Sequence, residues 1–103
     1  MQRIAIVCPG RGSYTEKSLR SLPAAHPFLE AAERLRAEAG LPSLRQLDSA
    51  PRFSAAEHLR PANVSALIYL HSMLDAEAAG AGRQVVAVAG NSMGWYTALA
   101  VAG

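Results

Sequence analysis

Two short apolar runs stand out in the hydrophobic pattern of this chain, and helical periodicity fills the segments between and after them. Arg3 to Cys8 (RIAIVC) is rich in β-branched residues and stops at Pro9-Gly10, which predicts a buried strand. Val85 to Ala89 (VVAVA) has the same character and stops at Gly90, which predicts a second strand. The expected order of elements is therefore strand, several helices, strand, helix.

Apolar residues spaced three or four positions apart predict the helices. In chain order, we expect a short helix over Thr15 to Leu22, a helix over Pro27 to Ala39, a helical turn over Ser43 to Asp48, a short helix opened by a capping box at Ser54 to Glu57, a buried helix over Asn63 to Ala79 and a last helix over Trp95 to Ala102. His71 falls on the apolar face of the longest helix. We interpret it as a hydrogen-bonded core histidine rather than a catalytic base.

Two apolar strands joined through helices are expected to be parallel neighbours in an α/β sheet, with ligands bound at the carboxyl ends of the strands. The loop after the first strand, Pro9 to Tyr14, contains Gly10 and Gly12, and its backbone N–H groups can hold an anion or an oxyanion. A plain turn is the alternative for this loop. The topology predicts that the loop lies on the same rim of the sheet as the turn that follows the second strand.

That second turn, Gly90-Asn91-Ser92-Met93-Gly94, has the pattern G-x-S-x-G between a predicted strand and a predicted helix. Glycines two residues either side of a serine let the strand and helix backbones pass closely, and the serine hydroxyl then stands clear of the sheet. The N–H of Met93 would be the first donor to an oxyanion at this helix start. The alternative is that Ser92 only caps the helix.

Composition and charge exclude several other classes of function. Half of the 103 residues are hydrophobic and 17% are charged, which is typical of one globular unit. The net charge is +2 with the basic residues scattered, so we expect no nucleic-acid partner, and no stretch is long enough to span a membrane. We interpret the single cysteine, Cys8, as a small buried hydrophobic residue, and the lack of a second cysteine is consistent with a reducing cytoplasm. No pair of His or Cys has metal-ligand spacing.

The two glycine motifs in this order resemble the opening of the malonyl-CoA:acyl-carrier-protein transacylases and of the acyltransferase domains of fatty-acid and polyketide synthases. The similar stretches are Pro9-Gly10-x-Gly12-Ser13 and Gly90-x-Ser92-x-Gly94-x-Tyr96-x-Ala98-Leu99. The resemblance implies that residues 1–103 are the N-terminal part of one acyltransferase domain with an α/β-hydrolase-like parallel sheet. In that family a downstream part carries the catalytic histidine and a small ferredoxin-like subdomain.

The resemblance also implies a reaction and its site residues. Ser92 would take the malonyl group of malonyl-CoA as an ester and pass it to the phosphopantetheine thiol of acyl carrier protein, with no permanently bound cofactor. The backbone N–H groups of Arg11 and Met93 would form the oxyanion hole, and the substrate pocket would include Gly10, Gly12, Asn91 and Trp95. Arg11, Tyr14, Asn91 and Trp95 depart from the family pattern, and the arginine at position 11 is interpreted either as a carboxylate-binding group or as a solvent-facing side chain.

The family places its general-base histidine, and the arginine that binds the malonyl carboxylate, beyond the nucleophile helix. His26, His58 and His71 do not match that position, so we expect this chain alone to be inactive or nearly so, and to need the remainder of the domain in cis or in trans as a partner. A serine esterase or thioesterase, and a non-catalytic interaction module, are the alternative functions.

Overall fold

The computed structural model describes all 103 residues, and its sheet has two strands, β1 (Gln2–Cys8) and β2 (Arg83–Gly90). The strands pair in parallel from Gln2 opposite Arg83 to Cys8 opposite Gly90, with one register shift between Ile4 and Ala5. The predicted parallel pairing is therefore confirmed, and the architecture is mixed α/β. Because Cys8 faces Gly90, the segments after both strands leave the sheet at the same end.

Five α-helices and two 3-10 turns make up most of the remaining chain. These are η1 (Arg11–Ser13), η2 (Glu16–Ser18), α1 (Pro27–Glu38), α2 (Leu44–Asp48), α3 (Ala55–His58), α4 (Pro61–Gly80) and α5 (Gly94–Ala102). Proline occupies the first turn of α1 and of α4, where its missing N–H needs no partner. The prediction of a helix over Thr15 to Leu22 is wrong, because only one 3-10 turn forms there and Arg20 has a φ of +58°.

The helix caps differ from the sequence prediction in one place. The Ser54 side chain makes no capping hydrogen bond, and the Ser54 N–H donates to Nδ1 of His58 at 3.0 Å. The predicted capping box with Glu57 is therefore wrong, because the Ser54 N–H that the Glu57 side chain would have to accept donates to His58 instead. A capping box does form between Thr15 and Ser18 at the start of η2.

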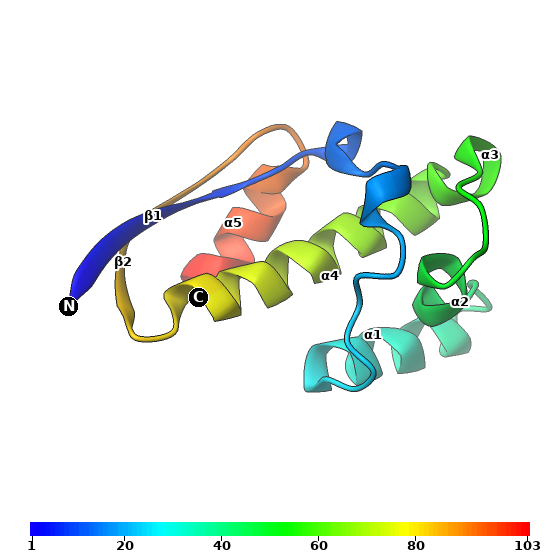
Figure 1. Ribbon diagram of the computed structural model, residues 1–103, viewed down its shortest axis with the longest axis horizontal. Helices are drawn as coiled ribbons and strands as arrows, with labels where there is room; N and C mark the ends of the chain where they lie inside the picture. The colour runs from blue at the N-terminus through cyan, green and yellow to red at the C-terminus, as the bar shows by residue number, and fades with distance from the viewer.

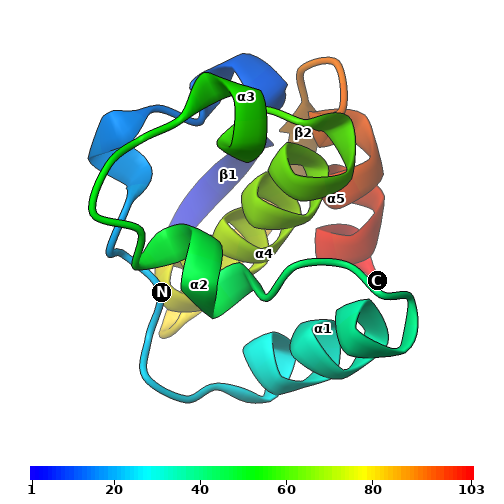
Figure 2. The same ribbon diagram turned by 90° about the vertical axis from the view of Figure 1, so that its right-hand side faces the viewer.

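Helices α4 and α5 lie side by side against one face of the sheet, as Figures 1 and 2 show. Residues of β1 alternate accordingly: Ile4, Ile6 and Cys8 are half-buried or buried on the helix side, whereas Ala5 and Val7 are exposed. Val7 is 72% exposed. The prediction of a fully buried first strand is therefore wrong for its second face, because no element covers that face.

The hydrophobic core lies on the helical side of the molecule and not under the sheet. It consists of Tyr14, Leu29, Leu44, Leu47, Val64, Leu67, Ile68 and Leu70, so that the first half of α4 packs against α1 and α2. Helix α1 follows its expected bounds closely, but Leu35 is 62% exposed and Arg36 is buried. Of the two leucines of α1, Leu29 therefore lies in the core and Leu35 does not.

Candidate active site at the strand ends

The turn after β2 has the geometry that a strained serine elbow requires. Ser92 has a φ of +56°, in the left-handed region that residues with a Cβ adopt only at a cost. The Asn91 N–H donates to the Cys8 carbonyl at 3.0 Å, which ties the turn to the end of β1. The N–H groups of Gly94 and Trp95 donate to the carbonyls of Asn91 and Ser92, so α5 begins directly at the turn.

Both glycines of the G-x-S-x-G pattern are required by close backbone contacts. A Cβ on Gly90 would lie 2.2 Å from the carbonyl of Gly94, and a Cβ on Gly94 would lie 2.1 Å from the carbonyl oxygen of Cys8. Such distances are far below van der Waals contact, so neither position accepts a side chain without a backbone shift. The steric reason predicted for these two glycines is confirmed.

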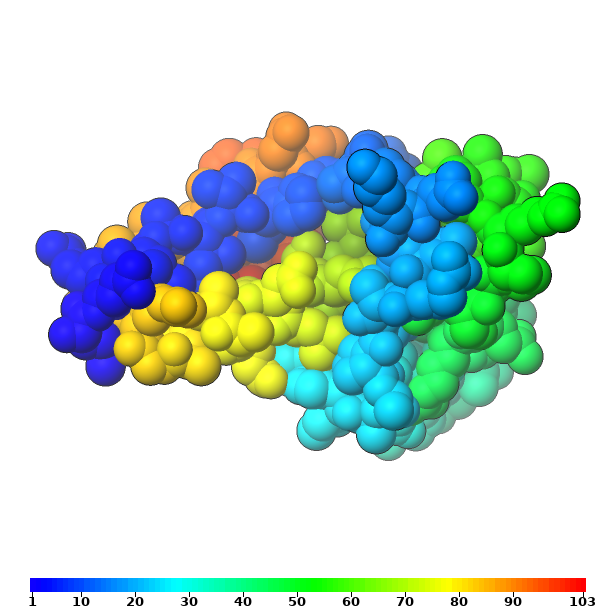
Figure 3. Space-filling model, in the orientation of Figure 1, coloured from blue at the N-terminus to red at the C-terminus, as the bar shows by residue number.

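The loop after β1 lies directly against this turn. A Cβ on Gly10 would approach the Asn91 carbonyl oxygen to 2.9 Å and the Cβ of Ser92 to 3.2 Å. The expectation that the two glycine motifs meet on one rim of the sheet is therefore confirmed, and Figure 3 shows the two segments next to each other on the surface. Gly12 differs, because a Cβ there would meet no atom within 4 Å and its φ is not positive.

Ser92 does not cap α5. It is exposed, its backbone is not in the extended region typical of an N-cap, and the helix start has no side-chain capping hydrogen bond. The hydroxyls of Ser13, Ser21 and Ser43 make hydrogen bonds within the chain, whereas the Ser92 hydroxyl makes none. The capping alternative is therefore contradicted, and the hydroxyl is free to react or to bind.

The two backbone N–H groups expected to hold an oxyanion are both free. Neither the Arg11 N–H nor the Met93 N–H donates a hydrogen bond to an acceptor in the chain. The Met93 side chain packs against the hydrophobic core, and this contact helps to hold the turn in place. The other predicted pocket residues, Asn91 and Trp95, are exposed on the same turn, and Trp95 is 59% exposed.

None of the three histidines forms a hydrogen bond with Ser92. His26 accepts from the Phe28 N–H through Nδ1, and its Nε2 lies 2.9 Å from Oε1 of Glu77. His58 is fully buried, with Nε2 2.8 Å from the Leu47 carbonyl oxygen.

His71 differs from its predicted role. It lies on α4 and is half-buried, and its Nε2 is inaccessible to solvent and has no hydrogen-bond partner. The prediction of a hydrogen-bonded core histidine is therefore wrong, because this part of α4 runs beside a cavity rather than through the core. Burial lowers the pKa of His71, and the carboxylates of Asp48 and Asp75 act in the opposite direction.

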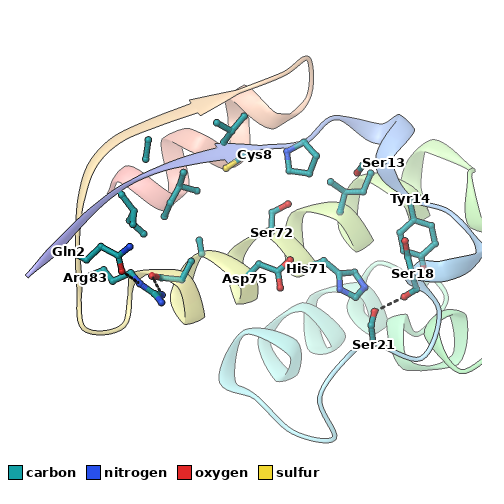
Figure 4. A pocket seen from close by; sticks show the side chains of 18 residues that line it. Gln2, Cys8, Ser13, Tyr14, Ser18, Ser21, His71, Ser72, Asp75 and Arg83 are labelled. Carbon is teal, nitrogen blue, oxygen red and sulfur yellow. Dashed lines mark hydrogen bonds between the residues drawn. The ribbon is translucent and has the colours of Figure 1, made fainter.

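The cavity beside His71 has a volume of about 740 Å³ and separates β1 from α4 (Figure 4). Its apolar wall includes Ile4, Ile6 and Ile68, and its polar residues include Ser72 and Asp75. Tyr14, at the end near the Pro9 loop, was expected on the rim but is buried, and its pKa is raised to about 12 by burial and by Asp48. Ser92 does not line this cavity.

Burial also raises the pKa of the Cys8 thiol, which is 1% exposed, so the expected role of Cys8 as a small buried hydrophobe is confirmed. No group of three or more His, Cys, Asp or Glu side chains is arranged to hold a metal ion. None of the helices combines the length and the apolar character needed to cross a bilayer. Comparisons of the chain with protein-family models, with curated proteins and with solved structures find no match.

Proposed function

We propose that Ser92 is the nucleophile of an acyl-transfer site, which accepts a malonyl group from malonyl-CoA and passes it to the phosphopantetheine thiol of an acyl carrier protein. The observation that carries this proposal is the positive φ of Ser92 between two glycines in close backbone contact. A serine on such a strained turn at a helix start is typical of acyl-transfer nucleophiles. The resemblance of the two glycine motifs to the malonyl transacylases supplies the donor and the acceptor.

The reaction would proceed in two steps at the same rim. In the first, the Ser92 oxygen bonds to the thioester carbon, the carbon–sulfur bond breaks, and the serine proton passes through a base to the departing CoA thiolate. In the second, the carrier sulfur bonds to the ester carbon, the carbon–oxygen bond to Ser92 breaks, and the thiol proton passes through the base to the Ser92 oxygen. The free N–H groups of Arg11 and Met93 support this assignment, because a developing oxyanion needs donors that are not already used.

The proposal assigns the base to a residue outside these 103, on the remainder of the acyltransferase domain in cis or in trans. The three histidines of this chain are bonded elsewhere or lie beside the β1–α4 cavity. A serine hydroxyl without a base is a weak nucleophile at neutral pH. We therefore expect slow acylation of the isolated chain, accelerated by an added small base such as imidazole.

Acylation by malonyl-CoA in the presence of imidazole tests the proposal. Intact-protein mass spectrometry is expected to detect one malonyl group per chain, and peptide mapping is expected to place it on Ser92. The variant Ser92→Ala should remain unmodified, and Ser49→Ala, which removes another exposed serine, should be modified as the parent chain is. A chain that stays unmodified under these conditions, or that is modified equally after Ser92→Ala, would contradict the proposal.

The fate of the acyl group then separates the proposal from its alternatives. Transfer to added pantetheine or carrier thiol supports an acyltransferase, whereas release to water at the same rate with and without thiol indicates an esterase or thioesterase. A fluorophosphonate probe that leaves Ser92 unlabelled, both alone and with imidazole, would instead favour a non-catalytic interaction module.

A further inference from the structure

Arg11 is the only charged residue in the two segments that meet at the strand ends, 9–14 and 90–95. Arg11 is exposed and makes no side-chain ion pair or hydrogen bond within the chain, as is also true of Arg3, Arg34, Arg52 and Arg60, but of these only Arg11 lies at the strand ends. The nearest acidic residue in sequence, Glu16, forms no ion pair with it. The rim beside Ser92 therefore carries one permanent and uncompensated positive charge.

The backbone places residue 11 next to the serine elbow. Arg11 directly follows Gly10, and the Gly10 backbone is so close to the elbow that an added Cβ would lie 3.2 Å from the Cβ of Ser92. The turn around Arg11 is held by Ser13, whose hydroxyl and N–H both donate to the Gly10 carbonyl, at 2.9 and 3.2 Å. The chain thus fixes the start of the Arg11 side chain at the rim while leaving its planar donor group free.

From this placement we infer that Arg11 binds an anionic group of the acyl donor, and that it makes the site select donors with negative charge near the thioester. This inference rests on the proposed role of Ser92. A guanidinium binds carboxylate or phosphate oxygens through two parallel N–H donors, so the chemistry required of the ligand is an oxyanion. In a malonyl-CoA donor that oxyanion belongs either to the free carboxylate of the acyl group or to the phosphates of CoA.

A binding experiment that needs no chemistry at Ser92 tests the inference. The Ser92→Ala chain is titrated with malonyl-CoA, acetyl-CoA, malonyl-pantetheine and acetyl-pantetheine, and dissociation constants are taken from backbone amide shifts in NMR spectra. We expect the donor that carries the recognised anion to bind about threefold to tenfold more tightly than its matched neutral donor. The further change Arg11→Gln should abolish this difference, and Arg11→Lys should keep part of it.

The four donors identify the source of the anion. A malonyl-over-acetyl preference that Arg11→Gln removes assigns the carboxylate, and a CoA-over-pantetheine preference that it removes assigns the phosphates. The control Arg34→Gln removes the same charge from an exposed position on α1 and should leave both preferences intact. The inference is overturned if no donor binds, if Arg11→Gln changes neither preference, or if Arg34→Gln changes them equally.

Failure of this inference and failure of the proposed function give different results. If the chain shows no Arg11-dependent preference for charged donors but Ser92 is acylated normally, only the inference about Arg11 is overturned. If the Ser92→Ala chain shows an Arg11-dependent donor preference but the parent chain is not acylated, only the proposed role of Ser92 as nucleophile is overturned.

Discussion

The residue that defines the site, Ser92, holds a left-handed backbone conformation although it carries a Cβ. The surrounding contacts impose this conformation, because the Asn91 N–H is bound to the end of β1 and the Gly94 and Trp95 N–H groups close the turn. Strain of this kind persists only where neighbouring structure determines it, and it is common at sites of chemistry. The position of the hydroxyl therefore depends on backbone contacts rather than on side-chain hydrogen bonds.

Replacing Ser92 with glycine and with alanine measures this strain. At most positions alanine is the more stabilising of the two, because glycine has more conformational freedom in the unfolded chain. At residue 92 we expect the reverse, with Ser92→Gly more stable than Ser92→Ala by about 1 kcal/mol in urea unfolding. Equal stabilities, or an advantage for alanine, would contradict the left-handed conformation.

The glycine contacts at the elbow predict a second stability difference. Gly94→Ala places a Cβ 2.1 Å from the Cys8 carbonyl oxygen, so the end of β1 or the start of α5 has to move. We expect the free energy of unfolding to fall by about 3 kcal/mol, as measured by urea denaturation. Gly12→Ala is the matched control, since no atom lies within 4 Å of the added carbon, and it should change stability by no more than about 0.5 kcal/mol.

At the scale of the elements, a buried arginine joins α1 to the start of α4. The Arg36 guanidinium donates to the carbonyls of Pro42 and Ala62 and to Oδ1 of Asn63, at 2.7, 2.8 and 2.7 Å. Asn63 in turn donates from Nδ2 to the Glu57 carbonyl. This network gives the buried guanidinium three acceptors and joins α1 to the first turn of α4.

Removing the arginine is therefore expected to be costly. Arg36→Ala leaves three acceptors without their donor, and we expect it to lower the free energy of unfolding by about 3 kcal/mol in urea denaturation. Arg34→Ala, on the exposed side of the same helix, should change it by no more than about 0.5 kcal/mol. Similar losses in both variants would show that helix propensity, and not the network, determines the effect.

The half-buried ring of His71 on α4 is expected to make the stability of the chain depend on pH. Burial lowers the pKa of His71 from its ordinary value of 6.5, so the unfolded chain takes up a proton there at a higher pH than the folded chain does. Stability is therefore expected to be highest above that value and to fall as the pH drops below it. His71→Gln should show a smaller loss in the urea midpoint between about pH 8 and about pH 5.5 than the parent chain. An equal loss would contradict this assignment.

At the scale of the whole molecule, the core and the candidate site lie in different regions. The buried hydrophobic cluster joins α1, α2 and the first half of α4, whereas Val7, Val86, Tyr96 and Leu99, on the sheet and α5, are between 46% and 75% exposed. A two-stranded sheet with one covered face gives little burial to its own strands. The elbow is positioned mainly by backbone hydrogen bonds, glycine contacts and the packing of Met93.

The sequence predicts the parts of this arrangement that depend on local chemistry. The two β-branched runs, the parallel pairing and the meeting of the Gly10 and Ser92 turns follow from composition, glycine spacing and topology. The sequence does not predict that Arg36 is buried while Leu35 is exposed, because helical periodicity does not show which carbonyl groups will lie near the Arg36 guanidinium in the fold. The burial of Tyr14, whose ring lies near His71 of α4, and the lack of a hydrogen-bond partner for His71 likewise depend on tertiary contacts.

The most direct test of the central claim compares Ser92 with every other serine of the chain under one reaction. The chain is treated with p-nitrophenyl acetate and imidazole, and the acetyl content of each serine-containing peptide is measured by mass spectrometry over time. The strained and unbonded hydroxyl is expected to make Ser92 the first serine acetylated, with the selectivity lost when the chain is unfolded in urea. Acetylation spread evenly over the exposed serines, or the same pattern in folded and unfolded chains, would contradict the account.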